Sequence, residues 1–189
     1  MTKNIPAEQA LEKLKQGNAI YIKSKTNPGD ISIERREETC NNGQKPYAII
    51  LACSDSREIP EAIFSAGIGD LFVIRVAGNV VDDHQLGSIE YAAEHLGCRL
   101  VVVLGHNFCG AVDAAMNHDP DNHIKYITDK ISLAIGKEKN EFLACCLNIK
   151  SCVREIENDV DIHHMEDEDG LKVLGAIYHL ENGLVEFLD

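Results

Sequence analysis

Three apolar segments that lack a polar–apolar alternation constrain the fold of this chain most strongly. They are YAIILAC (47–53), LFVIRVA (71–77) and RLVVVLG (99–105). A strand with one face in water alternates apolar and polar side chains, whereas a strand in a parallel sheet is covered on both faces and is apolar throughout. We therefore interpret the three segments as strands of a buried, mostly parallel β-sheet.

The segments around these strands predict an α/β fold, with the central sheet flanked by helices. Apolar residues at helical spacing indicate a helix behind Pro6, over residues 6–25, and further helices over most of residues 110–158. Residues 26–46 are polar and rich in turn formers, so we interpret them as a connector. Near the C-terminus, Asn182-Gly183 separates two apolar segments and predicts a strand pair. We expect one domain over 1–189, with an N-terminal helical arm and connector (1–46) and a core (47–189).

The charge and the N-terminus exclude several classes of partner. The net charge of −13 is opposite in sign to what phosphate-backbone binding requires, so we expect no nucleic acid partner. The acidic run EIENDVDIHHMEDEDG (155–170) is interpreted as a solvated face or loop. Residues 1–17 lack the apolar core of a signal peptide, and no apolar run is long enough to span a membrane. The cysteine count of 7 is odd and favours free thiols in a reducing compartment, so we expect a soluble, cytoplasmic protein.

Polar clusters follow all three apolar segments. They are CSDSR (53–57), RVAGN (75–79) and GHNFCG (105–110). Ligands of parallel sheets bind beyond the carboxyl ends of the strands, so we expect these clusters to lie close together. If a helix begins at His106, that residue and Cys109 share one of its faces. Together with Cys53 they form a Cys₂His set, which is a catalytic zinc set with an open fourth position. Either short motif alone would indicate ordinary packing, but the two together favour a metal.

These motifs carry a family resemblance. CSDSR followed by GHNFCGAV, with the segment between them, resembles the β-class carbonic anhydrases, strongly over residues 44–116 and weakly over 171–188. The resemblance implies a zinc lyase that interconverts CO₂ and bicarbonate by attack of zinc-bound hydroxide. It implies one Zn²⁺ per chain, on Cys53, His106 and Cys109. It also places a catalytic carboxylate–guanidinium dyad on Asp55 and Arg57.

The resemblance further implies a substrate pocket that is completed by a second copy of the chain. Gln44 matches a catalytic amide of plant-like members that donates to the substrate oxygen. Phe72, Tyr91 and Gly110 are assigned to the pocket, with the two aromatic residues coming from the partner subunit. We therefore expect a homodimer or a higher homo-oligomer. The apolar stripe of the first helix suits an arm that packs on a neighbour, although packing on its own domain is the alternative.

A subgroup of bacterial family members has a feature that this chain lacks. Those members carry a Trp three positions before the first ligand Cys, as part of an inhibitory bicarbonate pocket. Here that position is Ile50, and the chain contains no Trp. We therefore expect an open metal site, with Asp55 paired to Arg57 instead of bound to zinc.

The chain departs from the family pattern at three places. Asn107 replaces a common Ser, Glu58 replaces a common Val, and Tyr178-His179 replaces a common Tyr-Asp. None of these changes removes a ligand or the dyad. Two alternative functions remain: a hydrolase of CS₂ or COS with the same ligand set, and a non-catalytic zinc-binding regulator. The intact Asp55–Arg57 dyad argues against the second alternative.

Overall fold

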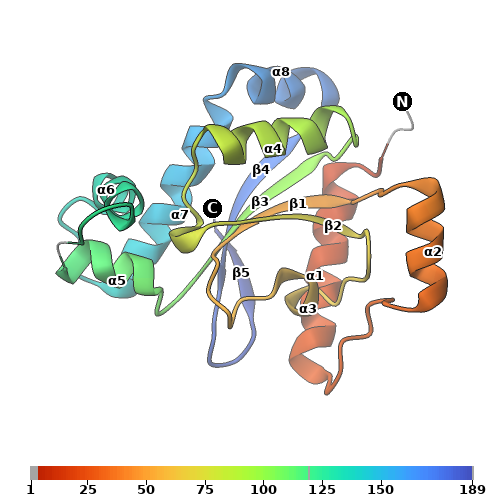
Figure 1. Ribbon diagram of the computed structural model, residues 1–189, viewed down its shortest axis with the longest axis horizontal. Coiled ribbons are helices and arrows are strands. Elements are labelled where there is room, and N and C mark those ends of the chain that lie inside the picture. The colour runs from red at the N-terminus through yellow and green to blue at the C-terminus, as the bar shows by residue number, and fades with distance from the viewer. Residues whose placement is uncertain (1–3, 119, 189) are drawn as a thin grey trace.

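The computed structural model describes residues 4–118 and 120–188 and contains a five-stranded sheet in the order β2-β1-β3-β4-β5. The ends of the expected domain, residues 1–3 and 189, lie outside this range. The strands are β1 (Ala48–Ala52), β2 (Leu71–Arg75), β3 (Leu100–His106), β4 (Lys172–Tyr178) and β5 (Val185–Leu188). The first four run parallel, and β5 pairs antiparallel with β4 at one edge (Figure 1). The expected mostly parallel sheet and C-terminal strand pair are both confirmed.

The helices flank this sheet (Figure 1). They are α1 (Ala7–Lys23), α2 (Ile33–Asn42), α3 (Pro60–Ile63), α4 (Asp83–Glu94), α5 (Gly110–Asn117), α6 (Ile124–Ile135), α7 (Glu141–Glu157) and α8 (Val160–Asp169). Ile49 and Leu51 of β1 face a core that includes side chains of α4, α6, α7 and α8. Ala48 and Ile50 face a second core, shared with α1 and α3. Because both faces are covered, the central strands are apolar throughout.

The apolar stripe of α1 packs on the chain's own sheet. Ala7 and Leu14 are buried in the same core as Ile50, and Leu11 packs against that core. Asn18, on the same helix, donates from Nδ2 to the carbonyl oxygens of Ile63 and Gly183. The structure therefore favours the alternative, packing on its own domain, because these side chains fill the core of that domain.

The expected connector contains a helix, α2. Ser32 caps it by accepting a hydrogen bond from the backbone N–H of Arg35 at 3.1 Å. The Arg35 guanidinium in turn donates to the carbonyl of Ile68 at 2.9 Å and to the Asp70 carboxylate at 3.2 Å. None of the ten residues of α2 is buried, so the helix leaves no apolar periodicity in the sequence.

Most of the acidic run forms helix α8, and its first three residues, 155–157, end helix α7. Ile162 and Met165 of α8 are buried in the core. Its acidic residues Asp161, Glu168 and Asp169 are exposed. The expectation of a solvated face is consistent with this arrangement. Over residues 4–118 and 120–188, no helix has the length and apolar character needed to cross a bilayer.

The sheet topology brings the polar clusters to one edge. Ala52, the last residue of β1, lies in register with Leu104 of β3 on one side and with Arg75 of β2 on the other. All three strands are parallel, so their carboxyl ends meet. The clusters that begin at Cys53, Arg75 and Gly105 therefore lie side by side.

Candidate metal centre

Three potential metal ligands converge at this edge of the sheet. Cys53 directly follows β1, His106 ends β3, and Cys109 is the N-cap residue of α5. One ligand atom from each residue lies within 4.8 Å of the other two, and all three residues are buried. The structure therefore brings together the Cys₂His set that the sequence motifs indicate.

A tight turn, and not a shared helix face, brings Cys109 back toward His106. Strand β3 continues through His106, and α5 begins only at Gly110. Between them Phe108 adopts φ 53°, a left-handed conformation that is uncommon for a residue with a side chain. The expectation that a helix begins at His106 is therefore wrong, because the strand pairing with β4 extends to that residue.

One nitrogen of His106 is held by the main chain, and the other faces the cluster. Nδ1 lies 2.8 Å from the carbonyl oxygen of Asn107, so it carries the proton in that hydrogen bond. Nε2 is buried and has no hydrogen-bond partner among the residues that the structure describes. A buried nitrogen lone pair without a partner is costly unless a ligand satisfies it. This orphaned atom, beside two thiols, fits a zinc ion.

Main-chain and charged groups surround Cys53. The backbone N–H of Gly78 lies 3.2 Å from its Sγ, and the Arg75 guanidinium donates to its carbonyl oxygen at 2.9 Å. Gly78 has φ 67°, and a Cβ at this position would lie 2.7 Å from Cδ1 of Ile131. The left-handed backbone and the nearby Ile131 side chain both favour glycine at this position. The RVAGN cluster marked this region in the sequence, but no pattern there indicated these contacts.

The pKa values of the two thiols are shifted in opposite directions. The hydrogen bond between them lowers the pKa of Cys53 and raises that of Cys109. The backbone amides of Val112 and Ala111, in the first turn of α5, favour the Cys109 thiolate, but the hydrogen bond to Cys53 and burial outweigh them and raise the pKa of Cys109. A metal that takes both sulfurs as thiolates must therefore displace the remaining proton.

The Asp55–Arg57 pair lies against this cluster. Nε of Arg57 donates to Oδ1 of Asp55 at 2.9 Å, and Nη2 donates to Oδ2 at 2.7 Å. The Arg57 side chain is the largest cause that holds the pKa of Asp55 well below its usual range. Oδ2 of Asp55 also lies 3.7 Å from Nε2 of His106. The carboxylate is thus ionised, oriented and adjacent to the candidate ligands.

Glu58 is a buried carboxyl group beside the same loop. Its Oε2 accepts the backbone N–H of Cys53 at 2.8 Å. Its Oε1 is buried and has no hydrogen-bond partner within the described part of the chain. Burial raises the pKa of Glu58 to about 8. The sequence showed this residue only as a departure from the family pattern, since its partners come from tertiary structure.

The other predicted pocket residues are not all near this cluster. Gln44 is exposed and precedes the amino end of β1, whereas Cys53 follows its carboxyl end. Phe72 and Tyr91 are in ring contact at 6.2 Å. Phe72 lies in register with Ile49 of β1. Ile49 is four residues before Cys53, so about 13 Å of strand separates the position of Phe72 from this ligand. Gly110 alone adjoins a ligand, and open space faces the position that its Cβ would take.

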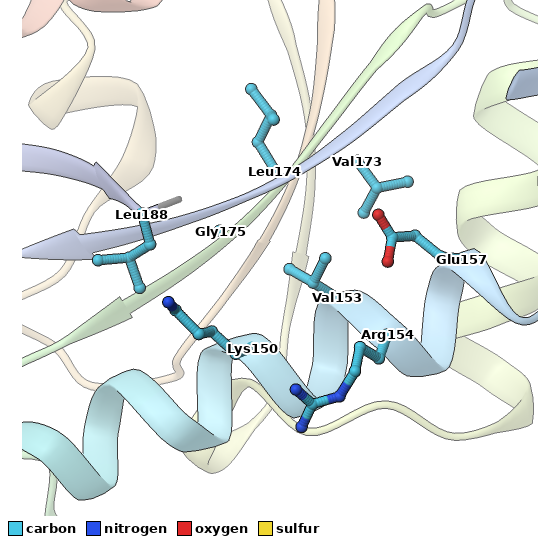
Figure 2. Close-up of a pocket in the computed structure, with 8 residues that line it drawn as sticks. All are labelled: Lys150, Val153, Arg154, Glu157, Val173, Leu174, Gly175 and Leu188. Atoms are coloured by element: carbon cyan, nitrogen blue, oxygen red, sulfur yellow. The ribbon is translucent and has the colours of Figure 1, made fainter.

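A separate hollow is lined by residues of α7, β4 and β5. It has a volume of about 420 Å³ and lies between α7 and the β4–β5 pair. Figure 2 shows Val153 of α7 and Leu188 of β5 at its walls, with Lys150 between them. None of the candidate ligands or dyad residues lines it, so we do not assign the chemistry to this hollow.

Comparisons with known proteins agree with this arrangement. A family model described as carbonic anhydrase matches residues 48–185. A carbonic anhydrase of Mycolicibacterium smegmatis is 34% identical over an alignment of 194 residues, which covers 94% of this chain and 91% of that protein. The β-carbonic anhydrase CafA of Aspergillus fumigatus has a similar structure, with TM-score 0.73, 26% identity, and coverage of 96% of this chain and 90% of that one. The β-carbonic anhydrase CcaA is also similar, with TM-score 0.72, 25% identity, and coverage of 96% and 94%.

Proposed function

This chain belongs to the β-class of the carbonic anhydrase family, and we propose that it catalyses the reversible hydration of CO₂ to bicarbonate and a proton. One observation carries the proposal. Two thiols and one imidazole with an unpartnered Nε2 converge within 4.8 Å, beside an ion-paired carboxylate. A purely structural metal site would need no such ion pair next to it.

We propose Zn²⁺ as the ion, one per chain, held by Cys53, His106 and Cys109. As in carbonic anhydrases generally, it would supply a Lewis acid that makes hydroxide available near neutral pH. Asp55 would accept a hydrogen bond from the attacking oxygen and orient its lone pair toward the carbon of CO₂. Arg57 keeps that carboxylate ionised and fixes its direction.

We propose that the site belongs to the open, plant-like type. The pairing of both Asp55 oxygens with Arg57 supports this, because a carboxylate held in this way is not free to rotate toward the metal. Ile50, buried in the core, occupies the position of the Trp that marks the inhibitory pocket in other members. The fourth ligand position would then remain available to water.

A second copy of the chain would complete the substrate pocket. Gln44 lies at the opposite end of β1 from its own Cys53 and therefore could serve only a partner's site. Tyr91 is 47% exposed and, with Phe72, presents an apolar surface that a small uncharged substrate would suit. We therefore propose a homodimer or a larger homo-oligomer.

We also propose a reducing, cytoplasmic location. All seven cysteines are free thiols, and Cys53 and Cys109 must stay reduced to bind a metal. An oxidising compartment would favour disulfide formation between neighbouring thiols such as these.

Stopped-flow measurement of CO₂ hydration tests the proposal. The zinc-loaded protein should accelerate hydration far above the buffer rate, a strong chelator should abolish this, and added zinc should restore it. A zinc-loaded protein no faster than buffer would contradict the proposal. If the protein hydrolysed CS₂ or COS but did not hydrate CO₂, it would instead be a hydrolase of those substrates.

A further inference from the structure

We propose that Asn107 is a positioning residue of the metal centre, which acts by clamping the His106 loop to the turn between β4 and β5. This inference rests on the proposed zinc site but concerns a residue that touches neither metal nor substrate. Its side chain fixes the position of its own carbonyl group, and that carbonyl holds the His106 ring.

The carbonyl of Asn107 determines which His106 nitrogen is available. It accepts a hydrogen bond from Nδ1 at 2.8 Å, so Nε2 keeps its lone pair and faces Cys53 and Cys109. A histidine ligand whose second nitrogen donates to a fixed acceptor is held in one tautomer and one ring orientation. Any movement of this carbonyl would therefore move the metal-binding nitrogen.

Three hydrogen bonds hold residue 107 against the β4–β5 turn. Its backbone N–H donates to the carbonyl of Tyr178 at 3.2 Å. Its Oδ1 accepts the backbone N–H of Leu180 at 3.0 Å, and its Nδ2 donates to Oε2 of Glu181 at 2.7 Å. Asn107 is only 6% exposed, so the described contacts satisfy both ends of a buried amide.

The clamp is needed because the following residue is strained. Phe108 has φ 53°, and its own carbonyl accepts a hydrogen bond from Nη2 of Arg57 at 3.1 Å. A left-handed residue with a side chain persists only where its surroundings fix it. The Asn107 contacts provide that restraint on one side of Phe108, and α5 provides it on the other.

Asparagine meets a requirement at this position that aspartate and serine do not meet. The site needs an acceptor toward Leu180 and a donor toward Glu181 on one side chain. Aspartate would place a second carboxylate against that of Glu181. Serine is shorter by one atom and has a single oxygen, so it could not reach both partners. The interaction with Glu181 is charge-assisted, which makes it the stronger of the two side-chain bonds.

Three variants test the clamp through zinc affinity, measured in competition with a chromophoric chelator. Glu181→Gln keeps an acceptor for Nδ2 and should change the zinc Kd by less than about threefold. Asn107→Asp sets two carboxylates against each other and should weaken zinc binding about 10- to 100-fold, the range for residues that orient a metal ligand. The double variant Asn107→Asp/Glu181→Gln exchanges donor and acceptor, keeps the wild-type net charge, and should recover to within about threefold of Glu181→Gln.

Two further measurements separate positioning from a general effect on folding. A merely structural clamp would lower the unfolding midpoint of the metal-free protein in Asn107→Asp, while the folded fraction would bind zinc as tightly as wild type. A positioning role predicts in addition an altered absorption spectrum of the Co²⁺-substituted Asn107→Asp variant, restored in the double variant. If Asn107→Asp does not fold, Glu181→Ala serves as the test in its place. It changes only an exposed residue and should still weaken zinc binding about threefold or more.

A zinc Kd for folded Asn107→Asp within threefold of wild type would overturn the inference. So would a double variant that binds zinc as weakly as Asn107→Asp, or, where the single variant does not fold, a Glu181→Ala variant with wild-type affinity. These outcomes are independent of CO₂ turnover. A zinc-loaded wild type that fails to hydrate CO₂ would refute the proposed function and leave the clamp standing.

Discussion

Arg57 binds both carboxylate oxygens of Asp55, at 2.9 and 2.7 Å, although the two residues are separated by only one position in the chain. The backbone N–H of Arg57 adds a third hydrogen bond to the same carboxylate, also at 2.9 Å. The guanidinium is further anchored to the carbonyl of Phe108, next to the ligand Cys109. The dyad is therefore attached to both of the loops that supply the candidate ligands.

Arg57→Ala should lower kcat for CO₂ hydration far more than it lowers zinc content. The three ligands remain, but Asp55 loses its partner, and misplacement of a reacting group by about 1 Å can cost about 100-fold in rate. Stopped-flow kinetics and metal analysis on the same sample measure the two effects. Arg36→Ala, which changes an exposed arginine of α2, is the matched control. Equal losses of zinc and turnover would mean that Arg57 supports only metal binding.

Cys53→Ser should abolish stoichiometric zinc binding, whereas Cys40→Ser should retain one zinc per chain. Cys53 is buried within the ligand cluster, and Cys40 is an exposed thiol of α2. A serine hydroxyl is a poor ligand for zinc beside one thiolate and one imidazole. Metal analysis after dialysis measures both variants. Full occupancy in Cys53→Ser, or two tightly bound zinc ions per wild-type chain at His163 and His164, would contradict the assignment.

The parts of this fold that were predictable from the sequence are those with local signals. Strands β1 and β3 are buried along their whole length, Cys53 and His106 stand at their ends, and Cys109 follows three positions after His106. Helix α2 was not predictable, because Arg35 stabilises it through Ile68 and Asp70, more than thirty positions away.

The residues that support the site could not be predicted from the sequence, for the same reason. Glu58, Arg75 and Asn107 act through hydrogen bonds to the main chain of other segments, and no spacing in the sequence encodes such contacts. The roles proposed for Gln44, Phe72 and Tyr91 require a second chain. Those three residues therefore stay predictions, which a mixing experiment can address.

Gln44→Ala and Asp55→Ala should each be nearly inactive alone but should regain activity when unfolded together and refolded as a mixture. Loss of the oriented Gln44 donor should cost about 100-fold in kcat, and loss of Asp55 removes the acceptor that orients the attacking oxygen. In a mixed dimer, the intact Asp55 site of one chain would receive Gln44 from its partner. Random pairing with one working site per mixed dimer should give about a quarter of wild-type activity.

Sedimentation at micromolar concentration, on the same samples, should show at least a dimer. As a control, each variant refolded alone should gain nothing. An absence of recovery in the mixture, or a fully active monomeric wild type, would show that Gln44 does not serve a partner's site.

Glu90→Gln should stabilise the protein near neutral pH but not near pH 4. Glu90 of α4 lies within 4.8 Å of Asp159 and Asp161, at the start of α8. Burial, followed by the charges of these two aspartates, raises the pKa of Glu90 above its ordinary value of 4.5. Between the ordinary and the raised pKa, the folded state binds more protons than the unfolded state, so stability falls as pH rises through this range. Above it, the three carboxylates repel one another in full.

The glutamine variant removes this penalty while keeping a donor toward Asp159, so the gain should appear only where wild-type Glu90 is ionised. We expect an increase of about 0.5 to 1 kcal/mol in the free energy of unfolding at pH 7, since the cluster is partly solvated. Urea unfolding at pH 4 and pH 7 measures it, with Glu37→Gln on exposed α2 as the control for removal of one negative charge. Equal gains in Glu90→Gln and Glu37→Gln would attribute the effect to the net charge of −13 and not to this cluster.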